Sequence, residues 1–408
     1  MPAETARPMT DTFATSLAPS GVRRGLALAL SGGGFRATLF HLGALRRLNE
    51  LGVLTSVDII TSVSGGSLMA ACLADAMMAS PPKAGAPLGN FDALAAKVHE
   101  LTSYNLRRTI LLKKALPQNW GRSLPELVAK ELEKHVTEKS LTALPPAPTF
   151  VFCATDMVFG VNWIYTRDRA GDFQAGYSST NLGAIGIAHA AAASACFPPI
   201  FAPISTLVDP TSLQGGMARG PDADRCRKEI RLSDGGVYDN MGLEPSWKGA
   251  ATLLVSDAGG PFEFARDRGT LADIKRYPDI IGNQARALRK RWLIDSYVSG
   301  IGPGGKAGFG GTYWSTGGSR VEYDKADTSG YSKATATMIA HIRTDLNTFS
   351  EAETAILENH GYLMTDVALK VHASNLWRPS PPAQPPFPAW LDDSKAQGAL
   401  KDSAKQKL

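Results

Sequence analysis

Hydrophobic positions along this chain fall into two patterns, short unbroken runs and longer stretches with helical spacing. The run 26–30 and the β-branched run 57–63 have the length of strands, and each ends at small residues. A helix-like pattern follows the first run, and an apolar helix is predicted over 68–78 after the second. This alternation is typical of α/β proteins. Further strands are predicted over 149–154, 161–165, 229–234 and 253–257, and further helices over about 91–115, 123–137, 333–343 and 350–360.

The first apolar run breaks into three glycines, Gly32, Gly33 and Gly34, before the helical pattern begins. Closely spaced backbone N–H groups without side chains suit the oxyanion of a tetrahedral intermediate, and one such donor lowers a barrier by about 2.7–4 kcal/mol. Arg36 adds a positive charge beside the loop. This segment therefore predicts an oxyanion hole.

Ser64 stands at the predicted turn between the second strand and its helix. A serine on such a turn projects its hydroxyl away from the sheet, and the turn requires small neighbours, here Ser62, Gly65 and Gly66. The N-terminus of the following helix also places the positive end of its dipole near developing negative charge. The segment predicts a nucleophile.

Two aspartates end later strands. Asp234 is followed directly by Gly235 and Gly236, and Asp257 is followed by Ala258 and a further glycine pair. A carboxylate at a strand end suits a general base for the serine. The residues alone leave both aspartates open.

Taken together, these segments resemble the patatin-like phospholipases. That family carries a glycine-rich oxyanion loop, a G-x-S-x-G nucleophile elbow and a D-G-G/A aspartate, and the small-residue and proline block 193–203 resembles the tract between elbow and aspartate. The string S-G-G-G-F-R-A at 31–37 is more similar to the cytosolic phospholipase A2 branch, and Ser62 replaces the first glycine of the elbow. The resemblance covers about residues 25 to 260.

The resemblance implies a three-layer α/β/α sandwich with a central, mostly parallel sheet. It also implies hydrolysis of fatty-acyl esters, with phospholipid as the substrate class. No cofactor is expected, and no metal either, because the sequence shows no zinc-site spacing, EF-hand loop or compact acidic cluster. Ser64 becomes the nucleophile, Asp234 rather than Asp257 its general base, and the Gly32–Gly34 backbone the oxyanion hole. Arg36 is expected to bind the substrate phosphate or to brace the loop. Such a dyad requires the carboxylate within about 3 Å of the hydroxyl and partly desolvated.

A dinucleotide site is the competing interpretation of the first glycine loop. Gly32, Gly34 and Ala37 satisfy G-x-G-x-x-G/A after a strand. That fold needs an acidic residue at the end of the second strand, whereas Asp58 lies at the beginning. The sequence therefore disfavours nicotinamide and flavin cofactors.

An ordinary Ser-His-Asp hydrolase is a second rival. In that fold the histidine follows the acid in a loop after a strand. We expect His41 and His189 to pack in helices, His341 and His360 to be solvated or capping, and His372 to lack the loop context. The histidines therefore offer no clear triad member.

Composition agrees with a soluble enzyme. The 43 Lys and Arg against 38 Asp and Glu give a net charge of +5, which gives little reason to expect nucleic acid. No apolar stretch reaches the roughly twenty residues that span a bilayer. The expected location is the cytoplasm, with peripheral contact to a membrane allowed by the lipid substrate.

Composition also suggests the domain organisation. Residues 1–24 are predicted to be a disordered leader, 25–376 the acyl hydrolase domain, and 377–408 an extended, proline-rich and polar tail. Within the domain, 207–226 is predicted to be an exposed loop near the site and 300–318 a mobile glycine-rich loop.

Two stretches, 104–114 and 287–294, mix bulky apolar residues with cations and would suit docking on an anionic membrane. Amphipathic helices of globular proteins have the same composition. Two functional alternatives also stay open. The acyl-enzyme would be resolved by an alcohol or amine in an acyltransferase, or the chain would be a non-catalytic membrane-binding or regulatory protein.

Overall fold

The computed structural model describes residues 23–197, 201, 203–247, 249–262, 269–300, 308–327, 329–401 and 403. The expected leader lies outside this part of the chain except for Arg23 and Arg24, and so do residues 198–200 and 202 of the proline block.

The described residues form a ten-stranded mixed sheet in the order β10-β9-β1-β2-β3-β4-β5-β6, with β8 beside β3 and β7 beside β8. The five strands from β10 to β3 are parallel, and the other pairings are antiparallel. The strands are β1 (Leu26–Leu30), β2 (Ile59–Val63), β3 (Thr149–Asp156), β4 (Val161–Tyr165), β5 (Ala170–Asp172), β6 (Gly176–Ser178), β7 (Ile204–Ser205), β8 (Arg231–Asp234), β9 (Thr252–Asp257) and β10 (Gly310–Ser315).

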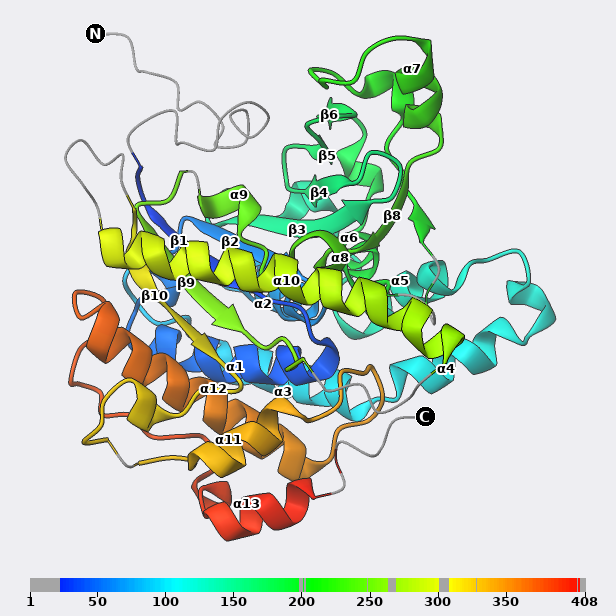
Figure 1. Ribbon diagram of the computed structural model, residues 1–408. Coiled ribbons are helices and arrows are strands. Elements are labelled where there is room, and N and C mark those ends of the chain that lie inside the picture. The colour runs from blue at the N-terminus through cyan, green and yellow to red at the C-terminus, as the bar shows by residue number, and fades with distance from the viewer. Residues whose placement is uncertain are drawn as a thin grey trace, which may run out of the picture.

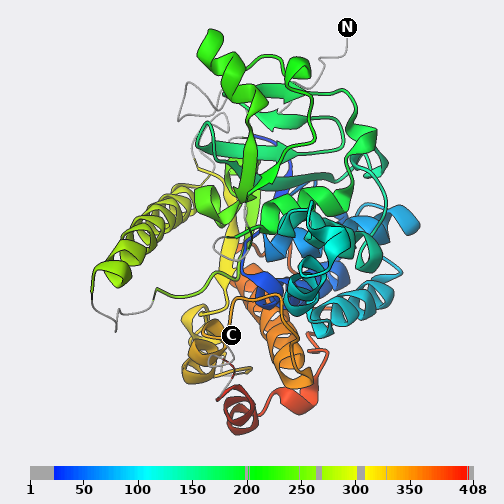
Figure 2. The same ribbon diagram turned by 90° about the vertical axis from the view of Figure 1, so that its right-hand side faces the viewer.

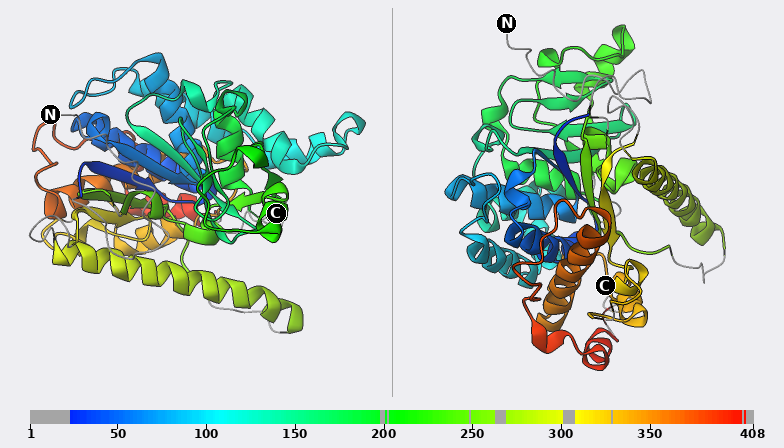
Figure 3. Two further views of the ribbon diagram at one scale, coloured as in Figure 1. Left: turned by 90° about the horizontal axis from the view of Figure 1, so that it is seen from above. Right: turned by 90° about the vertical axis from the view of Figure 1, so that its left-hand side faces the viewer.

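Helices cover both faces of this sheet (Figure 1). Seen from above, the sheet lies between α10 and the blue helices that follow β1 and β2 (Figure 3, left). The three-layer arrangement and the parallel centre of the sheet confirm the expected fold class. The helices are α1 (Gly34–Glu50), α2 (Gly65–Ala79), α3 (Phe91–Ser103), α4 (Leu106–Lys114), α5 (Leu124–His135), α6 (Ile187–Ala195), α7 (Pro221–Lys228), α8 (Gly236–Asp239), α9 (Glu244–Trp247), α10 (Thr270–Ser299), α11 (Lys333–Ala340), α12 (Glu351–His372) and α13 (Asp393–Leu400).

Strand β1 shows why the two faces differ. Its leucines, Leu26, Leu28 and Leu30, join the main core beneath α1, α2 and α12. Its alanines, Ala27 and Ala29, face a smaller core with side chains of β9 and α10. Because successive side chains of a strand point to opposite faces, the Leu/Ala alternation builds one thick and one thin layer.

Helices α1 and α12 meet backbone to backbone. A Cβ added to Gly43 would lie 1.9 Å from the carbonyl oxygen of Glu358, and one added to Gly361 would lie 1.9 Å from that of Phe40. Only glycine permits this approach, because any side chain would overlap a carbonyl. The contact fixes α1, whose first residues carry the glycine loop.

Three expectations about loops and tails were wrong. Residues 310–315 of the glycine-rich segment form edge strand β10, parallel to β9. Helix α7 begins inside the expected loop 207–226, with Pro221 at its first position. The tail is not extended over 388–400, because α13 packs on α11 and α12 and Tyr331 donates a hydrogen bond to the Trp390 carbonyl at 2.9 Å. The expected helix 91–115 is also two helices, α3 and α4.

Among the helices of the described residues, none has the length and apolar character needed to cross a bilayer.

Candidate active site

The sheet brings the predicted site segments to neighbouring strands. Val63 at the end of β2 pairs with Cys153 of β3, and Ala154 of β3 pairs with Asp234 at the end of β8. Strand β1, which leads into the glycine loop, lies parallel on the other side of β2. Ser64, Asp234 and the glycine loop therefore share one edge of the sheet.

Ser64 occupies the turn between β2 and α2 in a strained conformation. Its φ of 52° and ψ of −121° make it one of two non-glycine residues with positive φ in the described chain. Such a conformation costs about 1–3 kcal/mol and persists where the surroundings hold it. The Ser64 N–H donates to Ser194 Oγ at 2.9 Å, and the Ser64 carbonyl accepts from the Ser67 N–H at 2.8 Å. The strand-turn-helix predicted for this serine is present.

The glycines after Ser64 let α2 pack directly on the neighbouring backbone. A Cβ at Gly65 would lie 2.0 Å from the Gly34 carbonyl oxygen, and one at Gly66 would lie 2.3 Å from that of Leu30. Both contacts are with main chain, which cannot move aside. The elbow and the glycine loop are thus packed as one unit.

A buried group of three hydroxyls supports the elbow from below. Ser67 Oγ lies 2.9 Å from Ser62 Oγ and 2.8 Å from Ser194 Oγ, and Ser194 Oγ donates to the Cys153 carbonyl at 2.6 Å. The hydroxyl of Ser62, which replaces the glycine of the family motif, is therefore hydrogen-bonded in this buried group. Ser194 was not predicted, although it lies in the small-residue block that the sequence singled out.

Asp234 lies beside Ser64 with its carboxyl group buried. The Ser64 hydroxyl lies close enough to this carboxylate to lower its pKa, and the Gly236 N–H donates to Oδ1 at 2.7 Å. Burial raises the pKa of Asp234 to about 6, against the lowering effect of these two donors. The carboxylate is therefore a stronger base than an exposed aspartate and is ionised at neutral pH.

Asp257 is held in a different environment. Its carboxylate accepts from Arg286 Nη2 at 3.0 and 2.8 Å, from the Tyr313 hydroxyl at 2.7 Å and from the Gly259 N–H at 2.9 Å. Burial raises the pKa of Asp257, but Arg286, Gly259 and Tyr313 together outweigh it and hold the pKa at about 2. A carboxylate this well paired is a poor proton acceptor, so the geometry favours Asp234.

The glycine loop offers two free amides rather than three. The Gly32 N–H donates to the Asn240 carbonyl at 2.9 Å, so the expectation that it serves an oxyanion is wrong. The N–H groups of Gly33 and Gly34, at the start of α1, have no acceptor among the described residues. Gly34 has φ +59°, and a Cβ there would lie 2.6 Å from the Asp345 carbonyl oxygen. The loop therefore requires glycine and leaves a pair of donors.

Arg36 braces the loop and is not exposed to a substrate. Its side chain is 2% exposed, and the guanidinium donates to the carbonyls of Ala258 (2.8 Å), Ala340 (3.1 Å) and Ile342 (2.6 Å). The prediction that Arg36 binds substrate is corrected to the other role expected for it. Its partners lie directly after β9, at the last residue of α11 and two residues beyond it, and Arg36 ties these segments to α1.

Asn240 is a site residue that sequence reasoning did not single out. Its carbonyl accepts from Gly32, and its side-chain Oδ1 lies 2.5 Å from the Cβ position of Gly32 and 2.6 Å from that of Gly236. The same Cβ position on Gly236 lies 2.9 Å from Asp234 Oδ1. Asn240 therefore lies between the glycine loop and the Asp234 turn, and its place shortly after Gly236 was the available signal.

The histidines of the described chain form no hydrogen bond with Ser64 or Asp234. His41 is buried, as expected, and bonds to Ser256 Oγ and the Ser31 carbonyl, both at 2.8 Å. His360 was expected to be solvated or capping, but it is buried against the Thr316 carbonyl at 2.9 Å. Burial lowers the pKa of each of these two histidines to about 4, so both are neutral packing residues.

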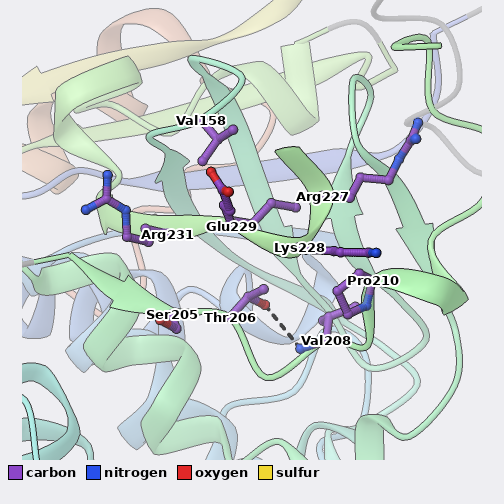
Figure 4. Close-up of a pocket in the computed structure, with 10 residues that line it drawn as sticks. Val158, Ser205, Thr206, Val208, Pro210, Arg227, Lys228, Glu229 and Arg231 are labelled. Atoms are coloured by element: carbon purple, nitrogen blue, oxygen red, sulfur yellow. Dashed lines mark hydrogen bonds between the residues drawn. The ribbon is translucent and has the colours of Figure 1, made fainter. Parts of the chain in front are cut away.

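A cavity of about 500 Å³ lies at the other end of β8 (Figure 4). Arg231, the first residue of that strand, lines it together with Arg227, Lys228 and Glu229, whereas Asp234 is the last residue of the strand. This cavity is therefore separate from the Ser64 and Asp234 pair.

Comparison with protein families matches residues 28–247 to the patatin-like phospholipase model. The matched region contains Ser64, Asp234 and the glycine loop. A comparison with curated protein sequences finds no significant match.

Comparison with solved structures finds chains that share little sequence with this one. Human GIVD cytosolic phospholipase A2 is 14% identical with a TM-score of 0.38, over 59% of this chain and 46% of that one. The same human protein in complex with methyl gamma-linolenyl fluorophosphonate is 14% identical with a TM-score of 0.48, over 94% of this chain and 60% of that one. VipD from Legionella pneumophila is 15% identical with a TM-score of 0.36, over 87% and 68%. The chain thus spans about half to two thirds of these proteins.

Proposed function

Because this chain belongs to the patatin-like phospholipase family, we propose that it is a lipid acyl hydrolase of the phospholipase A or lysophospholipase type with a Ser64–Asp234 dyad. Family membership supports lipid hydrolysis in general. The observation that supports the dyad is the placement of the Ser64 hydroxyl beside the buried Asp234 carboxylate, at strand ends that both adjoin β3. The carboxylate of Asp257, the other candidate base, accepts hydrogen bonds from Arg286.

In the first half-reaction, Ser64 Oγ attacks the acyl carbonyl and its proton passes to Asp234. The Gly33 and Gly34 amides and the N-terminus of α2 stabilise the oxyanion that forms. The intermediate then expels the alcohol portion of the lipid, which takes the proton from Asp234. An acyl-enzyme on Ser64 and a deacylated lipid result.

In the second half-reaction, Asp234 takes a proton from water, and the resulting hydroxide attacks the Ser64 ester. Collapse of the second intermediate releases the fatty acid and returns the proton to Ser64 Oγ. One carboxylate thus acts as base and then as acid in each half-reaction. A pKa of about 6 favours both steps, because it lies near neutral pH.

Fatty-acid release from a phospholipid with two different acyl chains, followed by mass spectrometry, tests this function. We expect release by the wild type and none above background from folded Ser64→Ala or Asp234→Ala. Because the two chains differ, the product also reports positional preference. Absence of release from phospholipid and from simple esters by the wild type would contradict the proposal and favour a non-catalytic protein.

An added alcohol separates hydrolysis from acyl transfer. With glycerol present, an acyltransferase would yield acyl-glycerol at the expense of free fatty acid, and both products would depend on Ser64. We expect free fatty acid to remain the main product. Acyl-glycerol in excess would replace the hydrolase proposal by the transferase alternative.

A further inference from the structure

A projecting segment of the chain carries exposed apolar side chains. This segment, residues 106–122, comprises α4 and the 3-10 turn η2 (Pro117–Asn119) and is named the hook (Figure 1; Figure 3, left). Leu111 and Leu116 are each 44% exposed, Leu112 is 61% exposed and Trp120 is 69% exposed. Single exposed apolar residues are ordinary, but a cluster on one protrusion marks an interaction surface.

The hook is ordered by polar bonds on its inner side. Lys114 Nζ donates to the carbonyls of Trp120 (3.0 Å) and Arg122 (2.6 Å), and Asn119 Nδ2 donates to the Lys113 carbonyl at 2.8 Å. The Trp120 indole N–H also donates to the Ala115 carbonyl at 3.4 Å, while the residue stays 69% exposed and the leucines make no polar contact. The shape of the hook therefore holds leucine and tryptophan outward.

All charged side chains of the hook are positive. No acidic residue occurs between Glu100 and Glu126, whereas the hook itself contains five cations. Ion pairs with Asp345 and Glu131 compensate two of them, and the other three form no ion pair within the described part of the chain. The five cations are Arg107, Arg108, Lys113, Lys114 and Arg122.

The hook is joined to the proposed oxyanion loop by a short path. Arg107 forms an ion pair with Asp345, and the Asp345 carbonyl accepts from the Phe35 N–H at 2.9 Å, directly after Gly34. Figure 2 looks toward this side of the molecule, where α10 and the cyan helices lie on opposite sides of the view. The hook is therefore tied to the glycine loop through Asp345.

We propose that the hook docks on an anionic lipid bilayer, with Leu112 and Trp120 entering the interface and Arg108 and Arg122 facing the headgroup phosphates. Apolar and cationic side chains mixed on one protrusion match the two components of such a surface. The inference rests on the proposed function for its purpose, since docking would bring lipid to Ser64, but vesicle binding itself does not require catalysis.

The second basic stretch of the sequence behaves differently. In 287–294, Leu288, Trp292 and Ile294 are exposed as well. Leu293 is buried, and Arg289 donates a hydrogen bond to the Tyr238 carbonyl. Lys290 lies over the Tyr313 ring at 4.3 Å. These contacts attach α10 to the body of the protein. The sequence of α10 also carries acidic residues, among them Asp279 and Asp295, whereas the hook contains none, so the docking surface for an anionic bilayer is assigned to the hook.

Flotation of the full-length Ser64→Ala protein with vesicles tests the proposal, because this variant is not expected to degrade the lipid. The vesicles contain phosphatidylcholine alone or mixed with phosphatidylserine. We expect binding to the mixed vesicles and weaker binding to neutral ones. Added Trp120→Ser or Leu112→Ser should weaken binding by about tenfold or more, and Arg108→Ala by about fivefold, since each cation near the surface contributes about 1 kcal/mol.

Matched controls lie elsewhere on the surface. Val298→Ser removes a side chain that is 83% exposed at the last turn of α10, and Arg225→Ala removes an exposed cation of α7. Neither should change vesicle binding. Equal loss in these controls and in the hook variants would overturn the proposal, because binding would then follow overall hydrophobicity and charge.

Three further results would overturn docking on lipid. The first is a Ser64→Ala protein that binds neither kind of vesicle, and the second is hook variants that bind as tightly as their parent. The third is a lipid-free dimer that Trp120→Ser converts to monomer, since a second copy would then cover the hook. Hydrolysis of a soluble short-chain ester by otherwise wild-type Trp120→Ser should be unchanged. Failure of the wild type in that assay would remove the proposed function and leave the vesicle result standing.

Discussion

Arg286 Nη2 lies 3.0 Å from Oδ1 and 2.8 Å from Oδ2 of Asp257, so one nitrogen of the guanidinium bridges both carboxylate oxygens. Asp257→Asn would leave this cation without its partner. We expect a loss of about 3 kcal/mol in the free energy of unfolding, measured by urea denaturation. Turnover of a soluble ester per folded molecule should change little. A large catalytic loss in a variant of normal stability would instead make Asp257 the base.

The pH dependence of catalysis should report Asp234. The base must be ionised, and burial raises its pKa to about 6. We expect kcat/KM on a soluble ester to be constant above that pH and to fall about tenfold per pH unit below it. An acid limb near pH 4 would contradict the buried dyad.

Asn240→Asp should move this limb. Its Oδ1 and that of Asp234 both lie within 3 Å of the Cβ position on Gly236, at 2.6 and 2.9 Å. A second negative charge there disfavours ionisation of Asp234 and raises its pKa further. The limb should therefore shift to higher pH, while Asn240→Ser, which adds no charge, leaves it in place.

Arg36→Ala should lower the stability of the protein and should not change its preference between substrates. The guanidinium satisfies three buried carbonyls, so its loss should cost about 3 kcal/mol in the free energy of unfolding. Activity on a phospholipid and on a phosphate-free ester should fall by the same factor. A selective loss on the phospholipid would restore Arg36 as a phosphate ligand.

Gly65→Ala should disable the site through sterics alone. Its Cβ would lie 2.0 Å from the Gly34 carbonyl oxygen, so α2 and the oxyanion loop must separate. Separation of these elements by even a few tenths of an ångström misplaces the donors, and we expect at least about a hundredfold loss of kcat. Gly398→Ala, where no heavy atom lies within 4 Å of the added Cβ, is the matched control and should be neutral or slightly stabilising.

The parts of the site that could be predicted are local in sequence. Ser64 and the glycine loop each lie in a pattern of strand, small residues and helix that spans about a dozen positions. The fold class followed from the same alternation and from the family resemblance that these segments carry. Asp234 could be preferred to Asp257 only through that resemblance, because Arg286, which separates them physically, lies 29 residues beyond Asp257.

The parts that could not be predicted depend on distant partners. Arg36 has the composition of a surface cation, yet its acceptor on Ala258 lies 222 residues away. Gly310 and Gly311 are typical of a loop, but the Cβ position of Gly311 lies 2.0 Å from the Leu253 carbonyl oxygen, so the edge strand requires glycine. The composition of the tail likewise did not predict that residues 388–400 would pack against α12 and Tyr331.

Covalent labelling measures the central claim most directly. A fluorophosphonate probe reacts with an activated serine, and peptide mapping by mass spectrometry locates the adduct. We predict a single adduct on Ser64, formed at least about a hundredfold more slowly in folded Asp234→Asn and at nearly the wild-type rate in the folded fraction of Asp257→Asn. An adduct on another serine, or labelling of Ser64 that is independent of Asp234, would contradict the dyad.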